Sequence, residues 1–230
     1  LASPPERVGL DTETTGLSPL LGARIRLVQL MAEGEDTAYV VDVWAVGDTW
    51  ARILQPLMAL PTTELVAHNA AFEVEHLAAA GIRMRGQVRC TLLAAWLLSR
   101  GVLPTQQRVK AKGSGLDLAS CCGRMLQLDV SKTEQTSDWS ADTLTEAQLQ
   151  YAAMDSWLAL KLWEMQRPAL QDSGMVKAHQ VECLTLPAVA EARLTGLTLD
   201  LKETKRLAGQ REDHLLQLQE RIHSQLGVEN

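Results

Sequence analysis

Residues 7–17 of the chain read Arg-Val-Gly-Leu-Asp-Thr-Glu-Thr-Thr-Gly-Leu. The apolar stretch 8–10 is short and is followed by polar residues and a glycine, which predicts a buried β-strand that ends at a turn. Asp11 and Glu13 are two residues apart, so their side chains project to the same side of a strand. Two carboxylates this close repel each other unless a cation lies between them, and Mg²⁺ and Mn²⁺ prefer oxygen ligands. The more common alternative for such a pair alone is two solvated acids at a strand end.

The rest of the chain is rich in Leu and Ala. Hydrophobic residues make up 46% of the 230 residues and aromatic residues only 4%, which favours helices over an all-β sandwich. Apolar patterning predicts strands at about residues 8–10, 24–31, 37–43, 64–67 and 87–90. It predicts helices at about residues 48–58, 70–80, 91–99, 116–126, 145–166, 177–195 and 202–226, with Asp48 as the cap of the first. Strands followed by alternating helix and strand, and then by helices, predict an α/β fold.

Charge and cysteine content exclude some classes of protein. The formal net charge is −6, which argues against a nucleic-acid binder that depends on a broad basic face. It does not exclude an enzyme whose carboxylates hold metal ions, because the ions reverse the sign of the site. The cysteines at positions 90, 121, 122 and 183 have no zinc-site spacing, so reduced thiols in a cytosolic-type compartment are expected. The longest apolar run has seven residues, and we expect no membrane partner.

Two further segments place polar groups where chemistry is expected. Residues 68–77 read His-Asn-Ala-Ala-Phe-Glu-Val-Glu-His-Leu and lie where a strand ends and a helix begins, a common place for ligand-facing groups. Taken alone, Asn69 is more often a helix cap, and both histidines are more often structural. Residues 151–155 read Tyr-Ala-Ala-Met-Asp, and the spacing of four puts Tyr151 and Asp155 on one helix face. An aromatic residue at this spacing more often packs in a core.

Together and in this order, the three segments resemble the exonuclease module of the DEDD superfamily, in its tyrosine-bearing branch. The first looks like the Asp-x-Glu motif, Asn-x-x-Phe-Glu looks like the second motif, and Tyr-x-x-x-Asp looks like the third. Residues 132–139, Lys-Thr-Glu-Gln-Thr-Ser-Asp-Trp, are similar to a stretch of the proofreading domains of family A DNA polymerases and of RNase D. The resemblance covers about residues 7–165. It departs at Glu73, where the second motif normally has the shorter Asp.

The resemblance implies a ribonuclease H-like fold, in which a mixed five-stranded sheet with three antiparallel strands first is flanked by helices. It implies a 3′-5′ exonuclease domain over residues 1–170. Residues 171–230 are then a helical C-terminal extension, because residues 186–200 look like the junction to a family A polymerase domain. The implied partners are the 3′ end of single-stranded DNA and a polymerase domain in the same parent chain. The implied setting is the cytoplasm of a bacterium or a phage-infected cell.

The resemblance also implies a mechanism and a set of site residues. Two divalent ions, Mg²⁺ or Mn²⁺, would act on the phosphodiester bond and release nucleoside 5′-monophosphates from the 3′ end. Asp11 would bridge both ions, Glu13 and Asp155 would complete the first ion site, and Glu73 would hold the second ion through water. Tyr151 would orient the attacking water. The residues that match positions along the path of the terminal nucleotides are Thr14, Leu17, Asn69 and Phe72, with Leu17 as a wedge between the last bases.

Two other functions stay open at this point. A free-standing RNase D-like enzyme that trims RNA 3′ ends would use the same site, although its usual C-terminal RNA-binding domain is not visible in this chain. A catalytically weak structural module is the second alternative, and Glu73 is its main support. Residues 100–115 contain Arg100, Arg108, Lys110 and Lys112 and no acid. A contact with the phosphate backbone is one interpretation of this stretch, and a solvated loop is the more common one.

Overall fold

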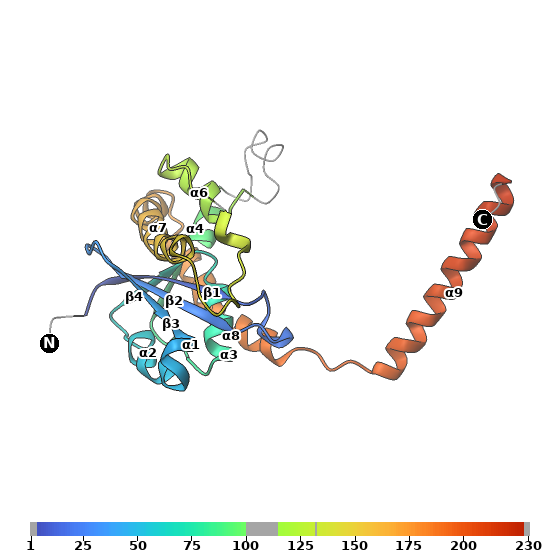
Figure 1. Ribbon diagram of the computed structural model, residues 1–230. Coiled ribbons are helices and arrows are strands. Elements are labelled where there is room, and N and C mark those ends of the chain that lie inside the picture. Colours follow the sequence, from blue (N-terminus) through green and yellow to red (C-terminus); the bar gives the residue numbers. More distant parts are fainter. Residues whose placement is uncertain (1–3, 100–114, 132, 228–230) are drawn as a thin grey trace. The chain divides into compact units, whose positions relative to one another are not determined.

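The computed structural model describes residues 4–99, 115–131 and 133–227 (Figure 1). The chain divides into two compact units, Leu1–Leu194 and Thr195–Asn230. The first unit contains a five-stranded sheet in the order β3-β2-β1-β4-β5. Its strands are β1 Arg7–Thr14, β2 Ile25–Ala32, β3 Ala38–Asp42, β4 Glu64–Ala67 and β5 Gln87–Cys90. The pairs β1–β2 and β2–β3 are antiparallel, whereas β4 runs parallel to β1 and β5 to β4. The predicted α/β class and mixed sheet are confirmed.

Except at residues 43–46, where no helix was predicted, the helices agree with the predicted ranges to within a few residues at most ends. They are α1 Val43–Val46, α2 Trp50–Met58, α3 Ala71–Ala79, α4 Thr91–Leu98, α6 Leu118–Met125, α7 Glu146–Asp172 and α8 Val176–Thr195. Short 3₁₀ turns are η1 Pro19–Leu21, η2 Gly47–Thr49 and η3 Thr133–Thr136. A capping box starts α7, because the Thr145 side chain accepts from the Gln148 N–H while the Gln148 side chain accepts from the Thr145 N–H.

Two predicted helix caps are wrong, and each was predicted from one residue type. Asp42, for which no cap was predicted, caps α1 with its carboxylate, so the third strand ends one residue earlier than expected. Asp48 does not cap a helix but lies in the turn η2. Asn69 does not cap α3 either, since it has a φ of 60° and Ala70 occupies the cap position. A residue suited to capping takes that role only when the backbone around it has the matching dihedral angles.

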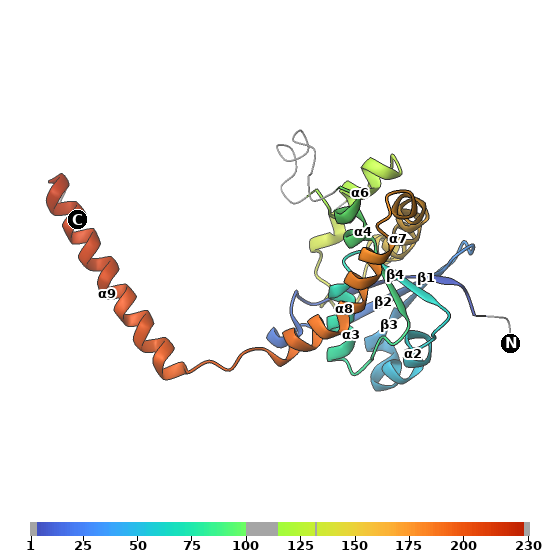
Figure 2. The same cartoon turned by 180° about the vertical axis from the view of Figure 1, so that it is seen from behind.

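Helices cover both faces of the sheet (Figures 1 and 2). On one face, Leu10 and Leu65 pack in a cluster that includes side chains of α2, α3 and α8. On the other face, Met31 and Val66 pack with side chains of α4 and α7. The outer side of α4 and α7 packs against α6. The central strands β1, β2 and β4 are therefore largely removed from water on both faces, as in other sheets that contain parallel strands.

Helix α7 and strand β1 approach each other closely at Gly9. A Cβ atom at this position would lie 2.1 Å from the backbone oxygen of Ser156. Only glycine leaves room for such a contact. Because Ser156 directly follows Asp155, and Gly9 lies two residues before Asp11, this contact sets how near the two carboxylates come.

Helix α8 belongs to the first unit by its packing. Cys183, Leu186 and Ala190 are buried in the same cluster as the sheet, and the His179 Nε2 lies 3.0 Å from the Cys90 oxygen. The division predicted at residue 170 marks where the resemblance to exonucleases ends, and as a domain boundary it stays a prediction. All four cysteines are free and buried, in agreement with the reduced thiols expected.

The second unit contains helix α9, Leu201–Leu226. The Asp200 carboxylate accepts hydrogen bonds from the N–H groups of Lys202 and Glu203, and the helix ends at Gly227 in the left-handed conformation. The helix was predicted at residues 202–226, and no residue within α9 is buried. Among the residues that the structure describes, no helix is long and apolar enough to cross a membrane.

Candidate active site

Three of the predicted acids meet at the sheet. Asp11 and Glu13 lie on the central strand β1, and Asp155 lies on α7, which covers that face. One carboxylate oxygen from each residue lies within 4.8 Å of the other two. Asp155 is only 7% exposed. Three carboxylates from two elements at this separation could share one divalent cation.

The electrostatics of this cluster favour a cation. Burial raises the pKa of Asp11 well above its ordinary value, and the charges of Glu73, Asp155 and Glu13 raise it further. Burial and then the charge of Asp155 raise the pKa of Glu13 to about 8. The pKa of Asp155 is raised to about 6 by burial, although the Tyr151 hydroxyl acts in the opposite direction. Carboxyl groups whose pKa is raised in this way hold their protons to a higher pH than usual, and a bound cation replaces those protons.

Glu73 lies beside the cluster but outside it. It is 3% exposed in the first turn of α3, and it is not one of the three residues whose oxygens gather within 4.8 Å. Among the neighbouring charges, that of Glu73 has the largest effect on the pKa of Asp11 and raises it. Its Oε2 atom has no hydrogen-bond partner in the described part of the chain, and burial, followed by the charge of Glu13, raises its pKa to about 8. A buried carboxylate with a free oxygen suits a cation or a water bound to one.

Tyr151 faces the same carboxylates from the first turns of α7. Burial raises the pKa of its hydroxyl above the ordinary value, and the charges of Asp155, Glu13 and Asp11 act in the same direction. The hydroxyl therefore stays protonated at neutral pH and can donate a hydrogen bond.

The four residues expected to line the substrate path lie at the surface or close to it. Leu17 is 89% exposed on the loop after β1. The Thr14 Oγ1 donates a hydrogen bond to the Gly16 carbonyl at 2.7 Å, and this bond closes the turn that precedes Leu17. Asn69 is exposed and Phe72 is half-buried at the start of α3. Their contact with a nucleic acid stays a prediction.

The two histidines of the second segment have structural surroundings, in agreement with expectation. The His68 ring atoms lie 2.8 Å from the Thr91 hydroxyl and 2.9 Å from the Leu116 oxygen. Burial lowers the pKa of His68 to about 4, so the ring is neutral. The His76 Nδ1 lies 3.0 Å from the Phe72 oxygen, and the ring centres of His76 and Phe72 are 4.0 Å apart.

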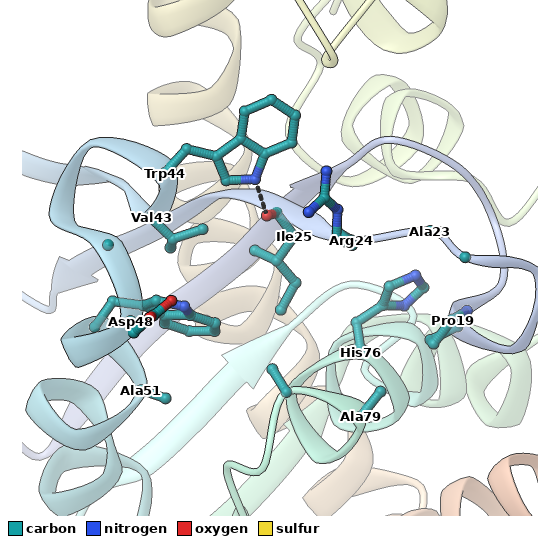
Figure 3. A pocket seen from close by; sticks show the side chains of 14 residues that line it. Pro19, Ala23, Arg24, Ile25, Val43, Trp44, Asp48, Ala51, His76 and Ala79 are labelled. Atoms are coloured by element: carbon teal, nitrogen blue, oxygen red, sulfur yellow. Dashed lines mark hydrogen bonds between the residues drawn. The ribbon is translucent and has the colours of Figure 1, made fainter.

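A cavity of about 840 Å³ is lined by the loop that joins β1 to β2 and by residues of α1, α2 and α3 (Figure 3). None of the predicted site acids lines it. The Arg24 guanidinium lies 5.2 Å from the centre of the Trp44 ring at this cavity. The Trp44 Nε1 donates to the Ile25 oxygen at 3.0 Å. The carboxylate cluster and this cavity are therefore separate features.

Gly9 is a site-forming residue that the sequence patterns did not single out. A signal was present, because a glycine inside an apolar strand often marks a close backbone approach. The basic residues of the 100–115 stretch, Arg100, Arg108, Lys110 and Lys112, lie outside the described residues.

The fold and the cluster define a class of protein. A mixed sheet flanked by helices, with acids on the central strand and on the helix across it, is the ribonuclease H-like architecture of exonucleases. A family model described as 3′-5′ exonuclease matches residues 2–171. The chain belongs to this family, the 3′-5′ exonuclease domain associated with family A DNA polymerases.

Individual relatives fall into two groups. DNA polymerase I of Aquifex aeolicus is 28% identical over 213 residues, which cover 84% of this chain and 32% of the polymerase. DNA polymerase I of Chloroflexus aurantiacus is 29% identical over 230 residues, which cover 94% of this chain and 23% of the polymerase. The solved structure of Brucella melitensis NrnC matches with a TM-score of 0.70 and 31% identity, over 84% of this chain and 86% of that chain. The chain thus spans about a third or less of the polymerases but most of the length of NrnC.

Proposed function

We propose that the chain is the 3′-5′ exonuclease part of a bacterial DNA polymerase and acts in proofreading. It would remove nucleotides from the 3′ end of single-stranded DNA as nucleoside 5′-monophosphates, in the cytoplasm. The observation that carries the proposal is the meeting of the Asp11, Glu13 and Asp155 carboxylates within 4.8 Å, in a chain of the 3′-5′ exonuclease family.

The residues present fit divalent ions. Asp11, Glu13 and Asp155 would hold one ion, and Asp11 together with the unpartnered Oε2 of Glu73 would hold a second through water. Mg²⁺ or Mn²⁺ suits this all-oxygen set, and a solved structure of Brucella melitensis NrnC has bound Mg²⁺. Bound ions of this kind polarise the phosphate and stabilise the charge that develops on it.

The other residues would position the substrate and the water. The Tyr151 hydroxyl, protonated at neutral pH, would donate a hydrogen bond that orients the attacking water. Leu17, exposed on its loop, would wedge between the last two bases, a contact that does not depend on sequence. Thr14, Asn69 and Phe72 would line the path of the terminal nucleotides.

A second candidate function is supported by the similarity to NrnC, which extends over 86% of that protein. A solved structure of NrnC is bound to pGG. The corresponding proposal for this chain is a free-standing, RNase D-like exonuclease that trims the 3′ end of RNA. Both proposals use the same carboxylate cluster.

The test compares matched DNA and RNA single strands, each labelled at the 5′ end and incubated with Mn²⁺ or with EDTA. The proposal predicts a ladder of DNA products that shorten from the 3′ end, with nucleoside 5′-monophosphates released only when Mn²⁺ is present. Faster shortening of RNA would establish the second candidate function instead.

A control variant tests whether contaminating nucleases cause the cleavage. Asp11→Ala, purified in the same way, should leave both strands intact. If neither strand is shortened by the unaltered chain, the site is that of a catalytically weak structural module. If Asp11→Ala is as active as the unaltered chain, the assignment of the site is wrong.

A further inference from the structure

Gln29 is a fully buried polar residue next to the carboxylate cluster. Its exposed fraction is 0%, and neither its Oε1 nor its Nε2 has a hydrogen-bond partner among the residues that the structure describes. Buried polar side chains are nearly always hydrogen-bonded in folded proteins, so an amide without any partner needs an explanation.

The strand register places Gln29 directly beside Asp11. The two residues are Cα partners in the antiparallel pair β1–β2. Residues paired in this way project from the same face of the sheet, with Cβ atoms about 4.5–5.5 Å apart. On its other side Gln29 is paired with Val40 of β3, which is apolar. Of the two residues paired with Gln29, only Asp11 can therefore form a hydrogen bond through its side chain.

The face that Gln29 and Asp11 share is the one covered by α7. Gly9, two residues before Asp11, faces the Ser156 backbone of α7, and side chains two apart on a strand share a face. Next to Gln29 on β2, Leu27 packs with Ala152 of α7 and Met31 packs with Leu160 of α7. Gln29 is thus enclosed between apolar side chains under the same helix that carries Asp155.

We propose that Gln29 is a positioning residue for Asp11: when a cation is bound, its Nε2 donates a hydrogen bond to the Asp11 carboxylate and orients the carboxylate toward the cation. An ionised carboxylate only accepts hydrogen bonds, so the amide presents its NH₂ end. The inference rests on the proposed function, because it takes Asp11 as a cation ligand.

This interaction explains why a polar residue occupies a position where an apolar one would pack well. Carboxylate ligands of metal ions are themselves held by outer hydrogen bonds, and loss of such a partner typically weakens metal affinity about 10- to 100-fold. Asp11 lies on a strand, so its backbone cannot move to compensate. The side-chain orientation of Asp11 then depends on neighbours such as Gln29.

The experiment uses the full chain and two matched variants, Gln29→Met and Gln166→Met. Gln166 is also 0% exposed, but its Nε2 donates to the Thr91 oxygen at 3.0 Å. Two quantities are measured for each protein: the melting temperature in EDTA, and the affinity for MnCl₂ alone by calorimetric titration.

The two variants should behave in opposite ways. Gln29→Met should keep the melting temperature in EDTA or raise it, because an unpaired amide is replaced by an apolar side chain of similar volume. Its affinity for Mn²⁺ should fall about 10- to 100-fold. Gln166→Met should lower the melting temperature, because the Thr91 oxygen loses its donor, while its affinity for Mn²⁺ stays unchanged.

Each other result would overturn the inference. Unchanged Mn²⁺ affinity in Gln29→Met would show that Gln29 does not act on Asp11. A melting temperature lowered as much as in Gln166→Met, or a variant that does not fold, would show that the amide has a structural partner. If the unaltered chain itself does not bind Mn²⁺, the proposed metal site fails first and the inference fails with it.

Discussion

Helices α7 and α9 have nearly the same length, 27 and 26 residues, and quite different surroundings. Both begin at a side-chain cap, Thr145 in α7 and Asp200 in α9. Helix α7 buries apolar residues such as Leu158 and Leu162 and carries Asp155 to the sheet, whereas α9 has no buried residue. Both were predicted from the sequence. Caps and propensity therefore decide that a helix forms, but they do not decide what the helix packs against.

The comparison gives each experiment on the first unit a natural control in the second. A change at α7 or its partners should affect the folding or the chemistry of the first unit, and the same change in α9 should leave both unchanged.

The largest effect is expected from the position of a truncation. A chain ending at Leu194 keeps the whole first unit, so its melting temperature and nuclease activity should equal those of the full chain. A chain ending at Ala169 loses Leu170, Cys183 and Leu186, which are buried. This removes roughly 5 kcal/mol or more of apolar burial, comparable with the whole free energy of unfolding of about 5–15 kcal/mol.

Thermal unfolding and gel filtration of the two truncated chains check this prediction. The shorter chain should be unfolded or aggregated at 25 °C. A shorter chain that folds and cleaves DNA would show that α8 is dispensable and would support a domain boundary at residue 170. An inactive chain ending at Leu194 would show instead that α9 takes part in the reaction.

The next effect concerns one aspartate on each helix. Asp155→Ala should lower the rate of DNA cleavage by more than about 100-fold, because loss of even an outer partner of a metal ligand costs about 10- to 100-fold. It should not lower the melting temperature in EDTA, since it removes a buried carboxylate that repels its neighbours. Asp213→Ala, on exposed α9, should change neither quantity. Equal rates for the two variants would remove Asp155 from the site.

Two glycines allow the same substitution in both regions. In Gly9→Ala the new Cβ would lie 2.1 Å from the Ser156 oxygen, so α7 must shift, at a cost of about 1–3 kcal/mol or more. Asp155 moves with α7, so Mn²⁺ affinity should fall together with the melting temperature. In Gly209→Ala nothing lies within 4 Å of the new Cβ. The free energy of helix formation in α9 should become more favourable by up to about 1 kcal/mol, and the helical circular dichroism signal should increase.

For Gly9→Ala, an unchanged Mn²⁺ affinity at a lowered melting temperature would contradict the link between the close approach and the site. The two glycines would then differ only in the space around them.

A smaller effect is expected at Glu73 and its neighbour Glu75. Glu73→Gln should lower the cleavage rate about 10-fold or more, because the charge acts on the ion, and Glu73→Asp should keep or raise the rate. Glu75 forms an ion pair with Arg193 at 3.1 Å, so Glu75→Gln should leave the rate unchanged and cost at most about 1 kcal/mol of stability. Single-turnover cleavage assays of the three variants decide this. An unaltered rate in Glu73→Gln would exclude Glu73 from the metal site.

The smallest expected effect is a pH dependence of stability without metal. The pKa values of Glu13 and Glu73 are raised from 4.5 to about 8 in the folded chain. A carboxyl group whose pKa is higher in the folded chain than in the unfolded chain stabilises the folded chain fully below pH 4.5, because the folded chain holds the proton more tightly. This stabilisation is lost as the pH rises through about 8. In EDTA the melting temperature should therefore fall from pH 6 to pH 8.5, by about 2–4 °C for each kcal/mol lost.

Added Mn²⁺ should reverse this trend, because the cation competes with protons for the same oxygens and binds more tightly at higher pH. Glu13→Gln should flatten the dependence measured in EDTA, whereas Glu212→Gln on α9 should not. A melting temperature that rises with pH in EDTA would contradict the raised pKa values.

Much of the first unit could be predicted from local patterns. Alternating and apolar runs indicated all five strands, and periodicity and caps indicated the long helices, because these signals act between residues close in sequence. Asp11 and Glu13 could be placed on one face of a strand from their spacing alone. The order of the three acidic segments added the resemblance to exonucleases, which the family model over residues 2–171 confirms.

Other features depend on contacts between residues far apart in sequence, so local patterns could not reveal them. Asp155 comes within reach of Asp11 because Gly9 lets α7 approach the sheet. Gln29 is buried beside Asp11 because of the strand register. Local sequence specifies which helices and strands form and which acids are available. Which of these acids meet depends on the packing of distant segments, because packing and loss of solvent act on neighbours in space.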